Sequence, residues 1–213
     1  MLTLIIDLDN TIYPVKSIGD KLFGPLFRLL EEPEYRLSKG ELETAKNEIM
    51  RRPFQNVAEE HGFSKKLIDE ALILLRELTY DGEMYSFEEY NFVKQLPVRR
   101  FLLTTGFTKL QQSKIAALGI SSDYEEVFIV DPDKQSETKK EVIERIIRKY
   151  TLDPAAVLIV GDDPESEIQA ASDLGLQSFL LDTHDRYPDD IATYKGRTLK
   201  DLQKTAAIKR LRN

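Results

Sequence analysis

The sequence has no cysteine among its 213 residues, which excludes disulfide bonds, thiolate catalysis and cysteine-ligated zinc. It also lacks a long apolar run near its start: Leu2–Ile6 is interrupted by Asp7, so this run is far too short to span a membrane. No basic stretch precedes it, as one would in a secretion signal. The signatures G-x-S-x-G, P-loop and H-E-x-x-H are missing. We therefore expect a cytoplasmic protein without a membrane partner, whose chemistry depends on other residues.

Excess positive charge is lacking as well. The chain has 37 Asp and Glu residues against 30 Lys and Arg residues, a net charge of −7. An acidic surface repels nucleic-acid polymers and anionic membranes, which argues against both as the main partner. A small phosphorylated molecule can still bind where a metal ion and one lysine provide local positive charge. We expect a small-molecule substrate and a protein that is a monomer or a homodimer.

Short apolar runs alternate with helical patterns along much of the chain. Five runs have the composition of buried parallel strands: Leu2–Ile6, Arg100–Leu103, Val127–Val130, Val157–Val160 and Ser178–Leu181. Between the later runs lie three helical stretches: Lys109–Leu118, Lys139–Tyr150 and Glu165–Leu174. This alternation predicts an α/β fold with a Rossmann-like parallel sheet.

Residues 15–84 interrupt this alternation. They contain no convincing strand, but four stretches have amphipathic helical spacing: Ile18–Leu30, Leu42–Met50, Phe54–His61 and Leu67–Leu78. A crossover of this size is a small helical domain of its own. We therefore predict a core of residues 1–14 and 85–213 with a helical cap, residues 15–84, inserted in it. The stretch Phe87–Gln95 is expected to be a helix that rejoins the core, closed by Pro97.

The first candidate site follows the first strand, at Asp7 and Asp9. Two carboxylates this close would repel each other unless a cation lay between them. At the carboxyl end of a strand they would face solvent and ligand, where one could attack phosphorus and the other could transfer a proton. A plainer interpretation is a polar turn that merely ends the strand.

Three further candidates also lie at or near strand ends. Thr104-Thr105-Gly106 offers a hydroxyl and backbone N–H groups for phosphate oxygens, although the same residues suit a helix N-cap and turn. A lysine near residue 139 could neutralise a nucleophile and a phosphoryl group. Lys134, Lys139 and Lys140 compete for that role, and each on its own is better explained as a solvated surface residue.

The last candidate is the acidic run Gly161–Ile168 after the fourth apolar run. Asp162 is well placed to bind magnesium, a hard cation that prefers oxygen ligands. Asp163 precedes a proline and an acidic residue, so it is equally well explained as a helix N-cap. Carboxyl ends of parallel strands meet at one edge of a sheet, so all four candidates should face the same crevice.

Taken together, these residues resemble the motifs of the haloacid dehalogenase superfamily of hydrolases, over essentially the whole chain. That family carries D-x-D-x-T, then a strand-end Ser or Thr, then Lys, then G-D-x-x-x-x-[D/E]. The matching residues here are Asp7, Asp9, Thr11, Thr104, Lys139, Asp162 and Glu167. Residues 15–84 stand where the family has its C1-type helical cap.

The resemblance implies a phosphatase mechanism. Asp7 would attack phosphorus to form an aspartyl phosphate. Asp9 would protonate the leaving oxygen and later activate water. The carboxylate at Asp9 separates phosphatases from the dehalogenases of the superfamily, which lack it.

The resemblance also implies a Mg²⁺ cofactor and a set of phosphate contacts. The Asp7 carboxylate, the Asp9 main-chain carbonyl and Asp162 would hold Mg²⁺, with Asp163 and Glu167 as further candidate ligands. Thr104, a lysine, and substrate-binding contacts at Thr11, Thr105 and Gly106 would hold the phosphoryl group. Our choice for the lysine is Lys139, because its separation from Gly161-Asp162 fits one family branch. Two departures are Glu167, where aspartate is commoner, and Thr105, where many relatives have asparagine.

The expected substrate is a nucleoside 5′-monophosphate, because Asp9–Pro14 resembles the D-N-T-L-Y-P opening of the pyrimidine 5′-nucleotidase-like branch. Phosphoglycolate and sugar phosphates are the alternatives. The cap aromatics Phe23, Phe27, Tyr35 and Phe54 could line a base-stacking pocket, although aromatic residues more often form core. Alternatives of another class are a phospho-receiver signalling domain, with Asp131 as its phosphorylated residue, and a non-catalytic binding protein.

Overall fold

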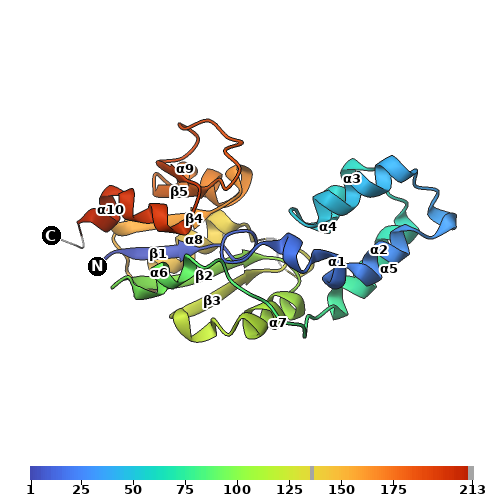
Figure 1. Ribbon diagram of the computed structural model, residues 1–213, viewed down its shortest axis with the longest axis horizontal. Coiled ribbons are helices and arrows are strands. Elements are labelled where there is room, and N and C mark those ends of the chain that lie inside the picture. Colours follow the sequence, from blue (N-terminus) through green and yellow to red (C-terminus); the bar gives the residue numbers. More distant parts are fainter. Residues whose placement is uncertain (135–136, 211–213) are drawn as a thin grey trace.

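The computed structural model describes residues 1–134 and 137–210. Within them, six parallel strands form one sheet in the order β3-β2-β1-β4-β5-β6 (Figure 1). The strands are β1 (Thr3–Ile6), β2 (Arg99–Thr105), β3 (Glu126–Val130), β4 (Val157–Gly161), β5 (Gln177–Leu181) and β6 (Tyr194–Gly196). The first strand therefore lies in the middle of the sheet, between β2 and β4. An α/β fold with a parallel sheet is confirmed.

The helices divide between the segment after β1 and the rest of the chain. Those of residues 15–84 are α1 (Gly19–Leu22), α2 (Gly24–Leu30), α3 (Lys39–Ile49), α4 (Phe54–Glu60) and α5 (Lys65–Glu77). The others are α6 (Tyr90–Gln95), α7 (Thr108–Leu118), α8 (Lys139–Lys149), α9 (Gln169–Asp173) and α10 (Ala206–Lys209). None of these helices is both long and apolar enough to cross a membrane.

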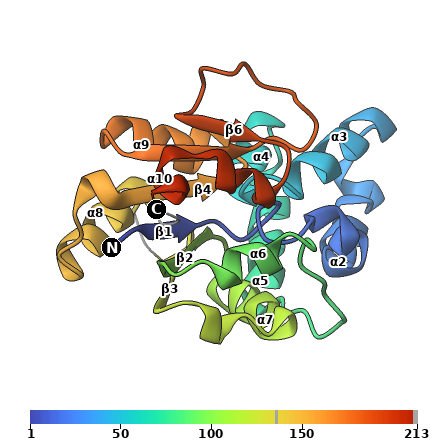
Figure 2. The same ribbon diagram turned by 60° about the vertical axis from the view of Figure 1, so that its left-hand side comes forward.

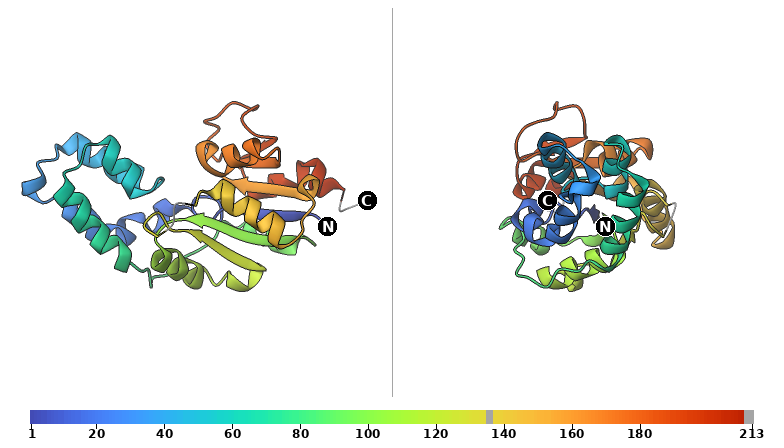
Figure 3. Two further views of the ribbon diagram at one scale, coloured as in Figure 1. Left: turned by 180° about the vertical axis from the view of Figure 1, so that it is seen from behind. Right: turned by 90° about the vertical axis from the view of Figure 1, so that its right-hand side faces the viewer.

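Alternate residues of β1 bury on opposite faces of the sheet, as the pleat of a strand requires. Leu4 and Ile6 belong to the core beneath α6, α7 and α10, whereas Ile5 belongs to the core beneath α8 and α9. Figure 3 shows α8, coloured yellow to orange, crossing the sheet when it is seen from behind. Cover on both faces explains why β1 is a continuous apolar run.

Helices α1–α5 gather beyond the carboxyl ends of the strands, away from both termini (Figure 1). The loop between β5 and β6 stands above the sheet in Figure 2. The division into a core and a cap with the boundaries 15–84 stays our proposal for this segment.

The five expected strands are present with slightly different ends, and three helical expectations need correction. Ile18–Leu30 is not one helix, because α1 and α2 are separated at Phe23; Pro25 lacks the N–H that a continuous helix needs and its ring clashes with the preceding turn. Glu165–Leu174 is a π-helical turn, Pro164–Ile168, followed by α9. The helix expected over Phe87–Gln95 begins only at Tyr90.

Candidate active site

The order of the strands brings three of the expected groups to one edge of the sheet. β1 pairs with β2 and β4, with Ile6 opposite both Leu102 and Val160. Asp7 lies one residue after Ile6, Thr104 two residues after Leu102, and Asp162 two residues after Val160. All three line one cavity of about 390 Å³. Asp9, Thr105, Gly106, Lys139, Asp163 and Glu167 line it too.

Asp7 lies in a buried ionic cluster with Lys139 and Glu167. The Lys139 Nζ atom donates to Asp7 Oδ1 at 2.7 Å and to Glu167 Oε2 at 2.6 Å. Only 6% of Asp7 and 2% of Glu167 are exposed. One ammonium therefore pairs with two carboxylates that are largely shielded from bulk water, where their attraction is stronger than at the surface.

The start of α8 explains why Lys139 reaches this cluster. Thr138 caps the helix in a capping box with Glu141, so the first helical residue, Lys139, faces the strand ends. Lys140 instead lies 3.5 Å from Asp173, and Lys134 pairs with Asp131 at 3.3 Å with 60% of its side chain exposed.

The pKa shifts in this cluster follow from burial and charge. Burial raises the pKa of Asp7 to about 7, against the opposing effect of Lys139. Burial, with Glu167 and Asp7 nearby, raises the pKa of Asp162 well above its ordinary value. Burial also acts on Glu167, but Lys139 outweighs it and lowers the pKa of that carboxyl. The cluster thus holds more negative charge than Lys139 balances.

The carboxylates fit a divalent cation. Oxygens of Asp7, Asp162 and Glu167 all lie within 4.8 Å of one another, and such hard ligands suit Mg²⁺. Burial and the nearby carboxylates raise the pKa of Asp162, and a cation there would offset both effects by favouring its ionised form. Asp163 is not in this group; its carboxylate accepts the N–H of Glu165 at 2.9 Å as an N-cap.

The predicted phosphate-binding residues have different surroundings. Thr104 is buried, and Thr104, Thr105 and Gly106 all line the cavity. The Gly106 N–H donates to the Val130 carbonyl at 3.0 Å, so it is engaged in the sheet. Thr11 is fully buried without a hydrogen bond to its hydroxyl in the described part of the chain, and it does not line the cavity.

The carboxylate of Asp9 has partners that the sequence analysis missed. It accepts hydrogen bonds from the Tyr13 hydroxyl, from Gln111 Nε2 at 2.8 Å and from Lys114 Nζ at 2.8 Å. Although burial alone would raise it, the pKa of Asp9 is lowered, because Lys114 favours the charged form. A signal existed in the sequence: Gln111 and Lys114 lie three residues apart on the face of α7 that buries Leu110 and Ile115. Polar side chains that are buried on an apolar helix face need hydrogen-bond partners.

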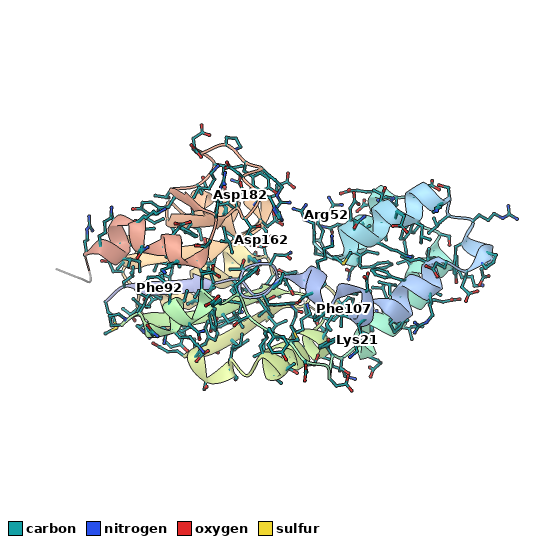
Figure 4. All side chains as sticks on the ribbon, in the orientation of Figure 1. Lys21, Arg52, Phe92, Phe107, Asp162 and Asp182 are labelled. Carbon is teal, nitrogen blue, oxygen red and sulfur yellow. The ribbon has the colours of Figure 1, made fainter. Side chains whose placement is uncertain are left out.

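The helical segment covers the cavity from the other side. Figure 4 shows Arg52 on the side of this segment that faces the core, where Asp162 is labelled. Its guanidinium pairs with Glu60 at 2.6 Å and Glu48 at 3.7 Å. Other residues of the segment that line the cavity are Phe23, Arg51, Phe54, Gln55 and Asn56.

The structure bears on two further expectations: the base-stacking aromatic residues and Asp131 as a phosphorylated residue. Phe27 and Tyr35 do not line the cavity, unlike Phe23 and Phe54.

Asp131 accepts the N–H and hydroxyl of Thr108 at 2.9 and 2.6 Å, together with the Asp133 N–H at 3.1 Å. This carboxylate therefore caps α7 and a turn, and it lies outside the cavity lining.

Solved structures of hydrolases resemble this one along nearly their full length. YfnB from Bacillus subtilis, crystallised with bound magnesium, has a TM-score of 0.64 and 17% identity, covering 95% of this chain and 97% of that one. A HAD phosphatase from Thermococcus onnurineus has a TM-score of 0.60 and 19% identity, covering 96% and 97%. A 2-haloacid dehalogenase from Pseudomonas syringae has a TM-score of 0.63 and 15% identity, covering 99% of both chains. At these identities the likeness concerns the fold alone.

The sequence itself matches one family model, described as haloacid dehalogenase-like hydrolase, over residues 1–175. No curated protein matches the chain. The family match covers most of the sequence and includes every residue of the cavity described above. The protein therefore belongs to the haloacid dehalogenase-like hydrolases.

Proposed function

We propose that the protein is a Mg²⁺-dependent phosphomonoester hydrolase with Asp7 as its nucleophile. The observation that carries this proposal is the pair of carboxylates with separate partners in one cavity. Asp7 contacts Lys139, while Asp9 contacts Lys114, Gln111 and Tyr13. A phosphatase needs a nucleophile and a second carboxylate for proton transfer, whereas the dehalogenases of the superfamily lack the second one.

The first step transfers the phosphoryl group to the protein. An Asp7 oxygen attacks phosphorus as the bond to the leaving oxygen breaks, and Asp9 gives a proton to that oxygen from its protonated form, which Lys114 makes the minor form. Lys139 and the Thr104 hydroxyl stabilise the charge on the phosphoryl oxygens. Mg²⁺ held by Asp7, the Asp9 carbonyl and Asp162, with Glu167 nearby, would supply further positive charge.

The second step hydrolyses the aspartyl phosphate. Asp9, now ionised, takes a proton from a water molecule whose oxygen attacks phosphorus. The acyl-phosphate bond breaks, inorganic phosphate leaves and the Asp7 carboxylate is restored. Asp9 regains its proton in the same step, so the cycle closes.

For the substrate we propose a nucleoside 5′-monophosphate, with phosphoglycolate and sugar phosphates as alternatives. Phe23 and Phe54 support this choice, since both line the cavity on the side of the helical segment, where a base could stack. Closure of this segment over the leaving group would select the substrate and exclude water.

Phosphate release from p-nitrophenyl phosphate tests the reaction. We expect repeated turnover with Mg²⁺ and, in Asp7→Asn, a fall in kcat of roughly a thousandfold or more, because the nucleophile is lost. Asp69→Asn is the matched control, since Asp69 pairs with Lys65 on the exposed side of α5. Activity retained in Asp7→Asn would disprove the proposed nucleophile. Release of a single equivalent would indicate a receiver domain instead.

A panel of nucleotides, sugar phosphates and phosphoglycolate then tests the substrate. The proposal predicts the highest kcat/KM for a nucleoside 5′-monophosphate, and a larger loss in Phe54→Ala for the nucleotide than for p-nitrophenyl phosphate. A preference for phosphoglycolate or a sugar phosphate would contradict the nucleotide assignment and leave the reaction class intact.

A further inference from the structure

Helix α7 buries a lysine beside the second carboxylate. Only 3% of Lys114 is exposed, and its Nζ atom lies 2.8 and 3.1 Å from the two oxygens of Asp9. In the described part of the chain, Asp9 is the one carboxylate within salt-bridge distance of it. A buried ammonium is strongly unfavourable without a counter-ion. The position of Lys114 is therefore explained by Asp9.

One turn earlier, Gln111 links the same carboxylate to the loop at the end of β2. Its Nε2 atom lies 2.8 Å from Asp9 Oδ2, 2.5 Å from Thr104 Oγ1 and 3.2 Å from the Thr105 carbonyl. Gly106 leaves room for this side chain, since a Cβ there would lie 3.0 Å from Gln111 Cδ. Gly106 also has φ +151°, in the region that favours glycine.

We propose that Lys114 is a positioning residue that fixes the Asp9 carboxylate for proton transfer, with Gln111 tying it to the phosphate-binding loop. The inference rests on the proposed function and gives each carboxylate its own lysine: Lys139 for Asp7 and Lys114 for Asp9. A free aspartate side chain samples several rotamers, whereas donors from Tyr13, Gln111 and Lys114 hold this one in a single arrangement. Pre-organisation of this kind lowers the barrier without tightening substrate binding.

Lys114→Met tests the inference, because it removes the charge and keeps most of the volume. We expect kcat for p-nitrophenyl phosphate to fall roughly 10- to 100-fold, the usual effect of a misplaced catalytic group. KM should fall in parallel, so that kcat/KM changes by less than about twofold, since formation of the aspartyl phosphate uses Asp7, Lys139 and Thr104, which are intact. Lys149→Met is the control, because Lys149 pairs with Glu126 on the surface of α8. A purely structural role would not lower kcat while leaving kcat/KM unchanged.

A burst experiment shows which of the two chemical steps is slowed in Lys114→Met. p-Nitrophenolate leaves without a proton, so a misplaced Asp9 chiefly delays hydrolysis of the aspartyl phosphate. Lys114→Met should therefore release about one equivalent of nitrophenolate per active site in a burst before slow turnover. Turnover with no burst and with unchanged kcat would overturn the inference.

A double-mutant cycle with Asp9→Asn tests whether Lys114 acts through Asp9. If it does, Lys114→Met should lower kcat by less than about twofold in the Asp9→Asn background. The double variant should also melt at a higher temperature than Asp9→Asn, which leaves a buried ammonium unpaired. Full multiplication of the two kcat losses would contradict the inference. If Lys114→Met does not fold, Lys114→Arg, which displaces the donors, is measured with the same expectation.

Failure of the inference differs from failure of the proposed function in the same assay. Wild-type turnover that depends on Asp7, together with a Lys114→Met variant of wild-type kcat, rejects the role of Lys114 alone. A wild-type protein without turnover rejects both.

Discussion

Two lysines begin the helix after β3 in consecutive positions, and only the first contacts the carboxylate cluster. Lys139 contacts Asp7 and Glu167, whereas Lys140 lies 3.5 Å from Asp173. Their side chains have the same length and charge, so they form a natural pair of test and control.

We expect Lys139→Met to lower kcat/KM by about 100-fold or more, because the charge beside the nucleophile and the phosphoryl oxygens is lost. Lys140→Met should change it by less than about threefold. Steady-state kinetics at saturating Mg²⁺ measures both. Equal losses in the two variants would show that general surface charge, rather than contact with Asp7, determines the effect.

Site residues were easiest to predict from the sequence where the strand directly before a residue determines its position. Asp7 directly follows one apolar run, and Asp162 follows another after a single glycine, so their place at the edge of the sheet was predictable. The choice among Lys134, Lys139 and Lys140 was open, since it depends on the residue at which α8 begins. The contact between Lys114 and Asp9 joins residues far apart in the chain, and no local pattern encodes such a partner.

At the scale of elements, the turn after β4 determines where Glu167 lies. Residues Pro164–Ile168 form a wide π-helical turn instead of the regular helix expected there. Glu167 lies in this turn, and its Oε1 atom accepts the N–H of Asp163 at 3.0 Å. Such turns recur at functional sites because they change which side chain faces inward. The helical spacing of residues 165–174 did not indicate this wide turn.

Gly161, the last residue of β4, has to be a glycine for the Glu167 side chain to lie where it does. A Cβ at Gly161 would lie 1.9 Å from Glu167 Oε1. Gly161→Ala should therefore displace Glu167 from Lys139 and destabilise the protein by about 1–3 kcal/mol, the usual cost of overpacking.

We expect the same variant to lower kcat by about tenfold or more, as a disturbed catalytic constellation does. Thermal unfolding and phosphate release measure the two effects. Gly40→Ala is the control, because nothing lies within 4 Å of a Cβ built there. If Gly161→Ala and Gly40→Ala behave alike, Glu167 does not depend on this close approach.

Across the whole molecule, the fold was more predictable than its short elements. Apolar runs and helical spacing suffice for a parallel sheet, because strands covered on both faces must be apolar throughout. β6 has only three residues, all partly exposed, so it leaves no apolar run. The approach of the helical segment to the core also depends on contacts between distant residues, such as Arg76 with Asp133 at 2.6 Å.

The carboxylate cluster connects the stability of the whole protein to pH and to magnesium. In the metal-free protein, burial raises the pKa of Asp7 to about 7 from an ordinary value of 3.8. Between these values the folded state keeps a proton that the unfolded chain has lost. The Asp7 contribution to the free energy of unfolding therefore falls as pH rises from about 4 to 7. Ionised Asp7 is thus unfavourable in the folded protein at neutral pH until a cation joins it.

Mg²⁺ binds the ionised form, so below pH 7 it must displace a proton. We expect Mg²⁺ at about 100 times its Kd at pH 8 to raise Tm by roughly 5–10 °C at that pH, from a binding contribution of about 2.7 kcal/mol. The same concentration should produce a much smaller rise at pH 5, where proton competition weakens binding. Asp162→Asn, which removes a carboxylate from the group of three, should lose most of the gain at pH 8. Only a site that contains ionised Asp7 and Asp162 links metal binding to pH in this way. An equal rise in Tm at both pH values, or a rise that persists in Asp162→Asn, would therefore mean that Mg²⁺ stabilises the protein at another site.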